Sequence, residues 1–181
     1  MRFFQVTCAQ GYEDVQFADR SDTDRIRDLG PQPQSATDWV PPELVPDPFD
    51  ERGRPLRPAT VMTPSRPSLT FRPQDRSRVE PYLSNWGEIL AATMSGQSML
   101  LFHCTTYADV FDLDRSNTSK PAKILPTTTV VFRPEAEELD ILTVSTHPTY
   151  GMFFSEKAVD SMRSDNDLFA GLTFIAVAET P

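Results

Sequence analysis

Apolar and β-branched residues gather in short runs along this chain, and short runs of this kind are typical of β-strands. Two of the runs flank a turn that contains Gly96, which predicts a β-hairpin. Strands are predicted at residues 1–8, 68–71, 88–94, 98–104, 127–132, 139–144 and 172–178.

Helical patterns are fewer and shorter. The sequence predicts helices at residues 22–29, from Pro73 to Trp86, from Thr106 through Phe111, and after Ser155. Pro81 lies inside the second of these and is expected to kink or split it, because the ring removes a backbone donor. Strands outnumber helices and do not alternate strictly with them. We therefore expect an α+β fold with a largely antiparallel sheet and a few short helices.

Prolines concentrate in one stretch, since ten of the 17 lie between Pro31 and Pro67. Such density predicts an extended arm without regular structure. Apolar residues such as Trp39 and Phe49 within it indicate that the arm lies on the body of the protein. The predicted organisation is an N-terminal strand and arm at 1–67 and an α+β domain at 68–181, together forming one structural unit.

Composition narrows the function classes. The 181 residues include 17 basic and 26 acidic side chains, for a net charge of −9, which disfavours nucleic acid and anionic membranes as partners. The start of the chain does not resemble a secretory signal, and two cysteines are too few for a disulfide framework, so we expect a cytoplasmic protein. The glycines form no phosphate-binding loop and the Cys and His residues have no metal-ligand spacing, so no cofactor or metal is predicted.

Few residues could carry catalysis. The chain has two histidines, and His103 is adjacent to Cys104 in a predicted strand, where neighbouring side chains point to opposite faces. A nucleophile assisted by a base would instead require Cys104 with His147, which the spacing does not predict. The competing interpretation is that all three are structural, because buried free cysteine usually behaves as a small apolar residue.

Carboxylates are plentiful after residue 108. Asp109, Asp112 and Asp114 would share or border one helix face, an arrangement compatible with metal ligation, an acidic binding surface or a solvated helix end. The glycine and the closing glutamate of an EF-hand loop are missing, which weakens calcium as a ligand. The sequence predicts a negative surface over residues 109–140.

The order of elements from Leu69 onward resembles an immunity-protein domain first described in a myxobacterium, found beside polymorphic toxins and long classified as a domain of unknown function. The resemblance covers about the last two thirds of the chain. Its stretches are 69–73, 86–90, 101–116, 131–135, 152–159 and 170–174. The match is partial, because His103 or Cys104 stands where the family pattern has Asn and Phe111-Asp112 replaces a small-residue stretch.

The resemblance implies a non-catalytic protein that binds one cognate toxin domain and neutralises it stoichiometrically. On that hypothesis the contact residues are Asp109, Asp112, Asp114, Glu135, Glu137, Glu138 and Asp140, with aromatic anchors Trp39 and Phe49. Two alternatives remain open at this point: a small hydrolase or transferase that uses Cys104 with His147, and an adaptor whose proline-rich arm docks a partner. The oligomeric state stays open as well.

Overall fold

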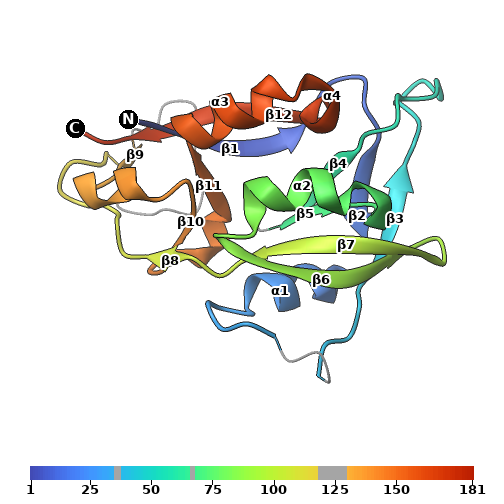
Figure 1. Cartoon of the computed structure of the whole chain (residues 1–181), viewed down its shortest axis with the longest axis horizontal. Coiled ribbons are helices and arrows are strands. Elements are labelled where there is room, and N and C mark those ends of the chain that lie inside the picture. Colours follow the sequence, from blue (N-terminus) through green and yellow to red (C-terminus); the bar gives the residue numbers. More distant parts are fainter. Residues whose placement is uncertain (35–37, 66–67, 118–129) are drawn as a thin grey trace.

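The computed structural model of the chain describes residues 1–34, 38–65, 68–117 and 130–181 (Figure 1). In chain order its elements are β1 (Arg2–Cys8), β2 (Asp14–Phe17), α1 (Arg20–Arg27), β3 (Glu43–Asp47), β4 (Val61–Ser65), β5 (Ser68–Phe71), the 3₁₀ helix η1 (Pro73–Asp75), α2 (Arg76–Leu83), β6 (Gly87–Met94), β7 (Gln97–Cys104), β8 (Tyr107–Ala108), β9 (Val130–Val131), η2 (Pro134–Glu138), β10 (Ile141–Val144), η3 (Pro148–Tyr150), β11 (Met152–Ser155), α3 (Glu156–Ser164), α4 (Asn166–Phe169) and β12 (Leu172–Glu179).

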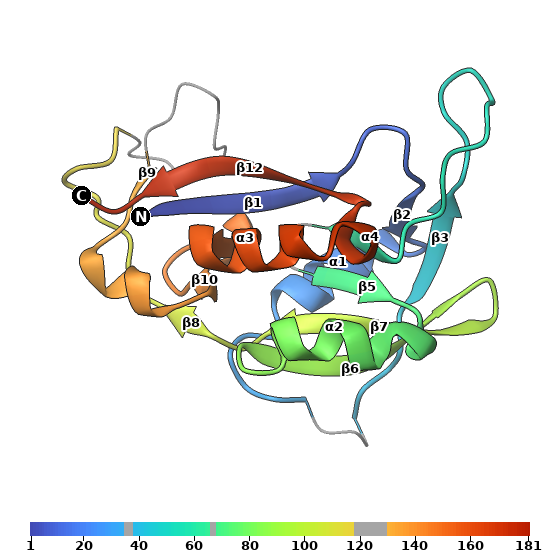
Figure 2. The same ribbon diagram turned by 45° about the horizontal axis from the view of Figure 1, so that its top comes forward.

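Two six-stranded sheets form the framework (Figures 1 and 2). The terminal sheet has the order β8-β10-β11-β1-β12-β9, and the hairpin sheet has the order β2-β3-β6-β7-β5-β4. Most neighbours are antiparallel, with parallel pairs at β3–β6, β8–β10 and β9–β12. The α+β prediction is confirmed. The segment 1–67 contributes strands to both sheets, and β1 lies between β11 and β12.

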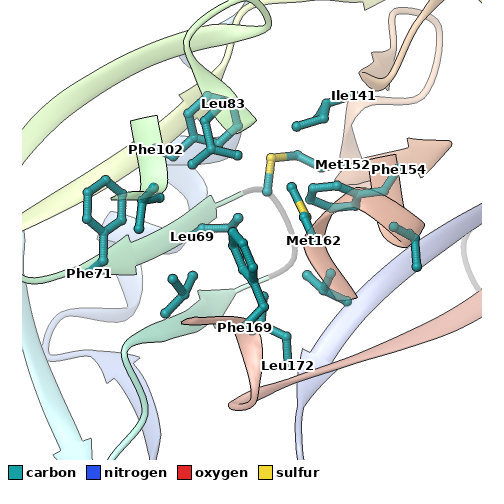
Figure 3. Close-up of a cluster of buried hydrophobic side chains, with 14 of the residues drawn as sticks. Leu69, Phe71, Leu83, Phe102, Ile141, Met152, Phe154, Met162, Phe169 and Leu172 are labelled. Carbon is teal, nitrogen blue, oxygen red and sulfur yellow. The ribbon is translucent and has the colours of Figure 1, made fainter. Parts of the chain in front are cut away.

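The main hydrophobic core joins the two sheets (Figure 3). Leu69 and Phe102 of the hairpin sheet meet Met152 and Phe154 of the terminal sheet there, and helices α2, α3 and α4 add further apolar side chains. Ser155 starts α3 as predicted, because its hydroxyl accepts a hydrogen bond from the backbone of the first turn.

The hairpin sheet is strongly curled, since its outer strands β2 and β4 lie against each other. The backbone N–H of Glu13 donates to the Arg57 carbonyl at 2.8 Å, and the Arg57 N–H donates to the Gly11 carbonyl at 3.0 Å. A second core fills the concave side, where Ile26 of α1 packs with residues of β2, β3, β6 and β7.

A third apolar cluster covers the other face of the terminal sheet. Phe132 packs there edge to face with both Phe3 and Phe153, at ring-centroid distances of 5.0 Å and 5.1 Å. Val110 and Phe111 join them from the segment that follows β8. The segments that carry the acidic residues after position 108 pack against this cluster through Val110, Phe111, Phe132 and Ala136.

The prediction that residues 31–67 lack regular structure is wrong. β3 and β4 lie within this stretch, because each of their prolines occupies a position that the ladder tolerates. Pro46 pairs with Val15 beyond the part of β3 that pairs with β6, and Pro64 lies in β4 at the edge of the sheet.

The helix predicted from Thr106 through Phe111 is also wrong. Tyr107 and Ala108 form β8 against β10 instead, and Phe111 forms a bridge with Phe132. Burial of Phe111 against the terminal sheet overrides the local helical spacing. Asp109 and Asp112 therefore do not share a helix face.

The strand predicted at 127–132 is described only from Val130, and its first three residues lie outside the described ranges. The helix predicted at 22–29 is observed two residues earlier, as α1. In the described ranges, no helix is long and apolar enough to cross a membrane.

Candidate functional site

The acidic residues predicted as a contact surface come together at one end of the molecule. Backbone hydrogen bonds connect their two segments, since the Arg133 N–H donates to the Val110 carbonyl at 2.7 Å and the Asp112 N–H donates to the Val131 carbonyl at 2.9 Å. Both chain termini lie at the same end (Figures 1 and 2). We call this region the acidic end; it comprises Asp109, Asp112, Asp114, Glu135, Glu137, Glu138 and Asp140.

Two of its aspartates are bound by nearby arginines. Asp109 forms an ion pair with Arg133 at 3.0 Å. Asp112 accepts a hydrogen bond from the Arg115 backbone N–H at 3.1 Å, and its other carboxylate oxygen lies 3.7 Å from the Arg115 guanidinium. These contacts close the loop after β8, so both carboxylates have a structural use.

Glu137 joins the two chain termini. Its carboxylate accepts a hydrogen bond from the Thr180 hydroxyl and lies 3.5 Å from the Met1 ammonium group, which also donates to Thr180 at 2.6 Å. The Thr180 hydrogen bond, aided by the positive charge of Met1, lowers the pKa of Glu137. Asp140 is similarly engaged, with Lys157 at 3.3 Å.

The other three acidic residues, Asp114, Glu135 and Glu138, are exposed and form no ion pair with any described residue. Leu113, which precedes Asp114, exposes 58% of its surface although it is a large apolar side chain. The Ser116 hydroxyl fixes this loop, because it donates to the Asp112 carbonyl at 2.6 Å and accepts from the Val131 N–H at 3.0 Å. An exposed apolar side chain on a fixed loop is suited to anchor a protein partner.

The two predicted aromatic anchors lie elsewhere. Trp39 donates its indole N–H to the Ala91 carbonyl at 2.7 Å and carries the Arg25 guanidinium 5.0 Å from its ring, so it fastens the arm to the hairpin sheet. Phe49 is 55% exposed, but it lies in the β3–β4 connection at the end of the molecule opposite the acidic end (Figures 1 and 2). The structure does not bring either residue to the acidic end.

Cys104 and His147 occupy different apolar clusters. Cys104 is buried in the core that joins the sheets, and burial raises the pKa of its thiol to about 11. His147 packs against Phe111 and Tyr150 on the far face of the terminal sheet, with ring centroids 5.6 Å away in both cases. A nucleophilic cysteine requires a lowered pKa, so this arrangement is the reverse of an activated thiol.

A partly buried pair that the sequence did not suggest, His103 and Glu88, lies on the concave side of the hairpin sheet. Nδ1 of His103 is 2.9 Å from a carboxylate oxygen of Glu88, and both oxygens of Glu88 accept from the Gln34 backbone N–H at 3.0 Å. The two-residue turn at Ser95-Gly96 sets Glu88 opposite His103, so the hairpin register contained the signal for this pair.

Ser68 lies opposite His103 on the other neighbouring strand, which sets serine, histidine and glutamate side by side across β5, β7 and β6. A hydrolytic triad requires the serine hydroxyl on the second imidazole nitrogen and access for substrate. Nε2 of His103 has no hydrogen-bond partner among the described residues, and His103 and Ser68 are at most 2% exposed. The pair instead secures Gln34 to the sheet.

Within the described ranges, no three His, Cys, Asp or Glu side chains are grouped so as to hold a metal ion. A comparison with known protein families finds no match for the chain, and a comparison with curated proteins finds none.

Proposed function

We propose that this protein is an immunity protein that binds one cognate bacterial toxin in the cytoplasm and neutralises it by covering its active or substrate-binding surface. The proposal starts from the partial sequence resemblance over the last two thirds of the chain. The structural observation that supports it is the exposed Leu113 beside Asp114, at the same end as Glu135 and Glu138, on a loop held by hydrogen bonds.

The chemistry of this surface suits a basic partner. An apolar side chain at the centre of an interface contributes binding energy, whereas surrounding charges mainly raise the association rate and select the partner. Toxins that act on nucleic acids carry basic surfaces, and a protein with a net charge of −9 attracts them over several ångströms at low salt. Asp114, Glu135 and Glu138 are the carboxylates available for this role, because the other four already have partners.

A binding protein fits the observed side chains better than the enzyme alternative does. The thiol of Cys104 is buried and has a raised pKa, and Ser68 and His103 are inaccessible. The adaptor alternative has weaker support as well, because part of the proline-rich stretch is engaged in β3 and β4.

The test is coexpression of the tagged chain with the candidate toxin domain encoded beside it. A one-to-one complex together with rescue of growth supports the proposal. No complex and no rescue contradict it.

Two triple variants then test the surface. The first is Asp114→Lys, Glu135→Lys and Glu138→Lys, and the control is Asp38→Lys, Asp47→Lys and Glu51→Lys, whose acids are exposed and lie in the arm. Each replacement adds two charges, so both variants move the net charge from −9 to −3. We expect the first variant to slow association and flatten its salt dependence much more than the control does. Equal effects of the two variants would exclude the acidic end as the contact surface.

A further inference from the structure

A hollow of about 300 Å³ opens where α3, α4 and the start of β12 meet. Its apolar floor is made by Met162, Phe169 and Leu172, all of which also belong to the main core. The start of β12, which lines the hollow, lies at the opposite end of that strand from the acidic end (Figures 1 and 2). The hollow is therefore independent of the surface that we propose for the toxin.

Polar groups border this apolar floor. The Arg163 guanidinium lies 5.7 Å from the Phe4 ring centroid and 5.9 Å from the Phe174 ring centroid, so aromatic faces hold it in place. It forms a long ion pair with Asp160 at 3.9 Å, which is beyond hydrogen-bond distance. Among the described residues, the guanidinium N–H groups make no hydrogen bond.

Asn166 and Thr173 complete the border of the hollow. Both are exposed, and neither side chain forms a hydrogen bond within the described part of the chain. An amide, a hydroxyl and a guanidinium group thus surround one apolar depression with their donors available. The accessible lining is therefore partly apolar and partly polar, and small-molecule sites likewise combine apolar surface with a few converging polar groups.

Close packing fixes the chain between the lining residues Ala170 and Leu172. A Cβ at Gly171 would lie 2.5 Å from the Ala59 Cβ and 2.9 Å from the Val61 carbonyl oxygen, so the chain approaches β4 as only glycine permits. The Gly171 carbonyl accepts from the Ala9 N–H at 2.9 Å. A site held in this way needs little ordering when a ligand binds.

We propose that this hollow binds a carboxylate joined to a compact apolar group. The apolar group lies on Met162, Phe169 and Leu172, and the carboxylate accepts hydrogen bonds from Arg163, with Asn166 and Thr173 as further donors. Arginine is the side chain best matched to a carboxylate, because its fork donates two parallel hydrogen bonds. The volume is at the lower end of the roughly 300–1,000 Å³ typical of ligand pockets, which limits the apolar group to about one aromatic ring.

The experiment is a titration of the whole ¹⁵N-labelled chain, followed by the shifts of the Asn166 side-chain amide and the Thr173 backbone amide. The probes are 3-phenylpropionate and its neutral isostere 3-phenylpropionamide. We expect the acid to bind about tenfold more tightly than the amide. No shifts at millimolar acid, or equal affinities for acid and amide, would overturn the proposal.

Two arginine variants test whether Arg163 is the side chain that binds the carboxylate. Arg163→Gln should abolish the preference for the acid, whereas Arg76→Gln should retain it; both arginine side chains are 52% exposed and lie on helices. Retention of the preference in Arg163→Gln contradicts the assignment.

The peptide Gly-Gly-Phe with a free or amidated C-terminus distinguishes two sources of the same chemistry. Tighter binding of the free peptide than of 3-phenylpropionate indicates a chain terminus as the ligand, and weaker binding indicates a small organic acid. In either case the carboxylate must be preferred over the amide.

Discussion

Gly87 begins β6 at a point where β6 and β7 approach each other too closely for any side chain. A Cβ at this position would lie 2.1 Å from the His103 carbonyl oxygen, 2.7 Å from a ring carbon of Phe102 and 2.9 Å from the Cys104 Cα. Two of these three atoms are backbone atoms, so rotation of a side chain cannot relieve the overlap. Replacement by alanine must shift β6 away from β7 at the end of the hairpin.

The expected cost follows from that geometry. Overpacking of a well-packed site costs about 1–3 kcal/mol, and a contact with the backbone of a central strand belongs at the upper end. We expect Gly87→Ala to lower the free energy of unfolding by about 3 kcal/mol.

Gly96→Ala in the turn of the same hairpin is the matched comparison. A Cβ at Gly96 meets no atom within 4 Å, and the cost there comes from its φ of +75°. That conformation costs an alanine about 1–2 kcal/mol. Both substitutions restrict the unfolded chain equally, so this contribution cancels between them.

Urea denaturation of the two variants and the parent, followed by tryptophan fluorescence, measures the difference. Trp86 is adjacent to Gly87 and reports on the end of the hairpin. We expect the order of midpoints to be parent, Gly96→Ala, then Gly87→Ala, with similar slopes. A Gly87→Ala variant as stable as Gly96→Ala would refute the close approach of the two strands.

Three further predictions concern the surface, a helix cap and a thiol. Full burial of a leucine is worth about 1.5–3 kcal/mol, and 58% of the Leu113 surface remains to be buried by a partner, which corresponds to about 0.9–1.7 kcal/mol. Leu113→Ala should therefore weaken toxin binding about 4- to 20-fold through faster dissociation. Ile175→Ala, at a side chain that is 50% exposed, should leave the dissociation rate unchanged. Ser155→Ala should lower the free energy of unfolding by about 1–2 kcal/mol in urea, because its hydroxyl caps the Ala158 N–H at 3.1 Å; a change near zero would contradict the cap. The pKa of Cys104 is raised from 9.0 to about 11, so the unfolded chain ionises first and stability should fall as pH rises through this interval. Subtracting the pH profile of Cys104→Ala isolates this effect, and identical slopes would refute it.

Local signals predicted the elements that depend on neighbouring residues. The hairpin follows from two apolar runs around Ser95-Gly96, and α3 follows from the cap at Ser155. Local signals failed where a distant partner decides the conformation. Tyr107 and Ala108 become a strand because they pair with Thr143 and Val144, and no pattern within residues 106–111 contains that information.

The same limit applies to the candidate surface. The sequence indicated a group of carboxylates, but it did not show which of them already have a charged partner in the fold. Glu137, for example, is paired with the Met1 ammonium group, which is 136 positions away along the chain. The sequence did not predict the hollow beside α4 either, since the position of its lining residues Ala170 and Leu172 depends on the approach of Gly171 to Ala59.

The position of β1 has a consequence for how the chain acquires its structure. Residues 2–8 are synthesised early, yet both of their strand partners, β11 and β12, come from the last part of the sequence. During translation the terminal sheet cannot close until β12 has emerged, and until then Phe3 and Phe4 lack the neighbours that bury them. Such long-range pairing slows folding, because the chain loses the entropy of the closed loop before any contact between the paired strands stabilises it. Chains shortened before β12 should therefore accumulate as aggregation-prone species, whereas the β5–β6–β7 core can form well before synthesis ends.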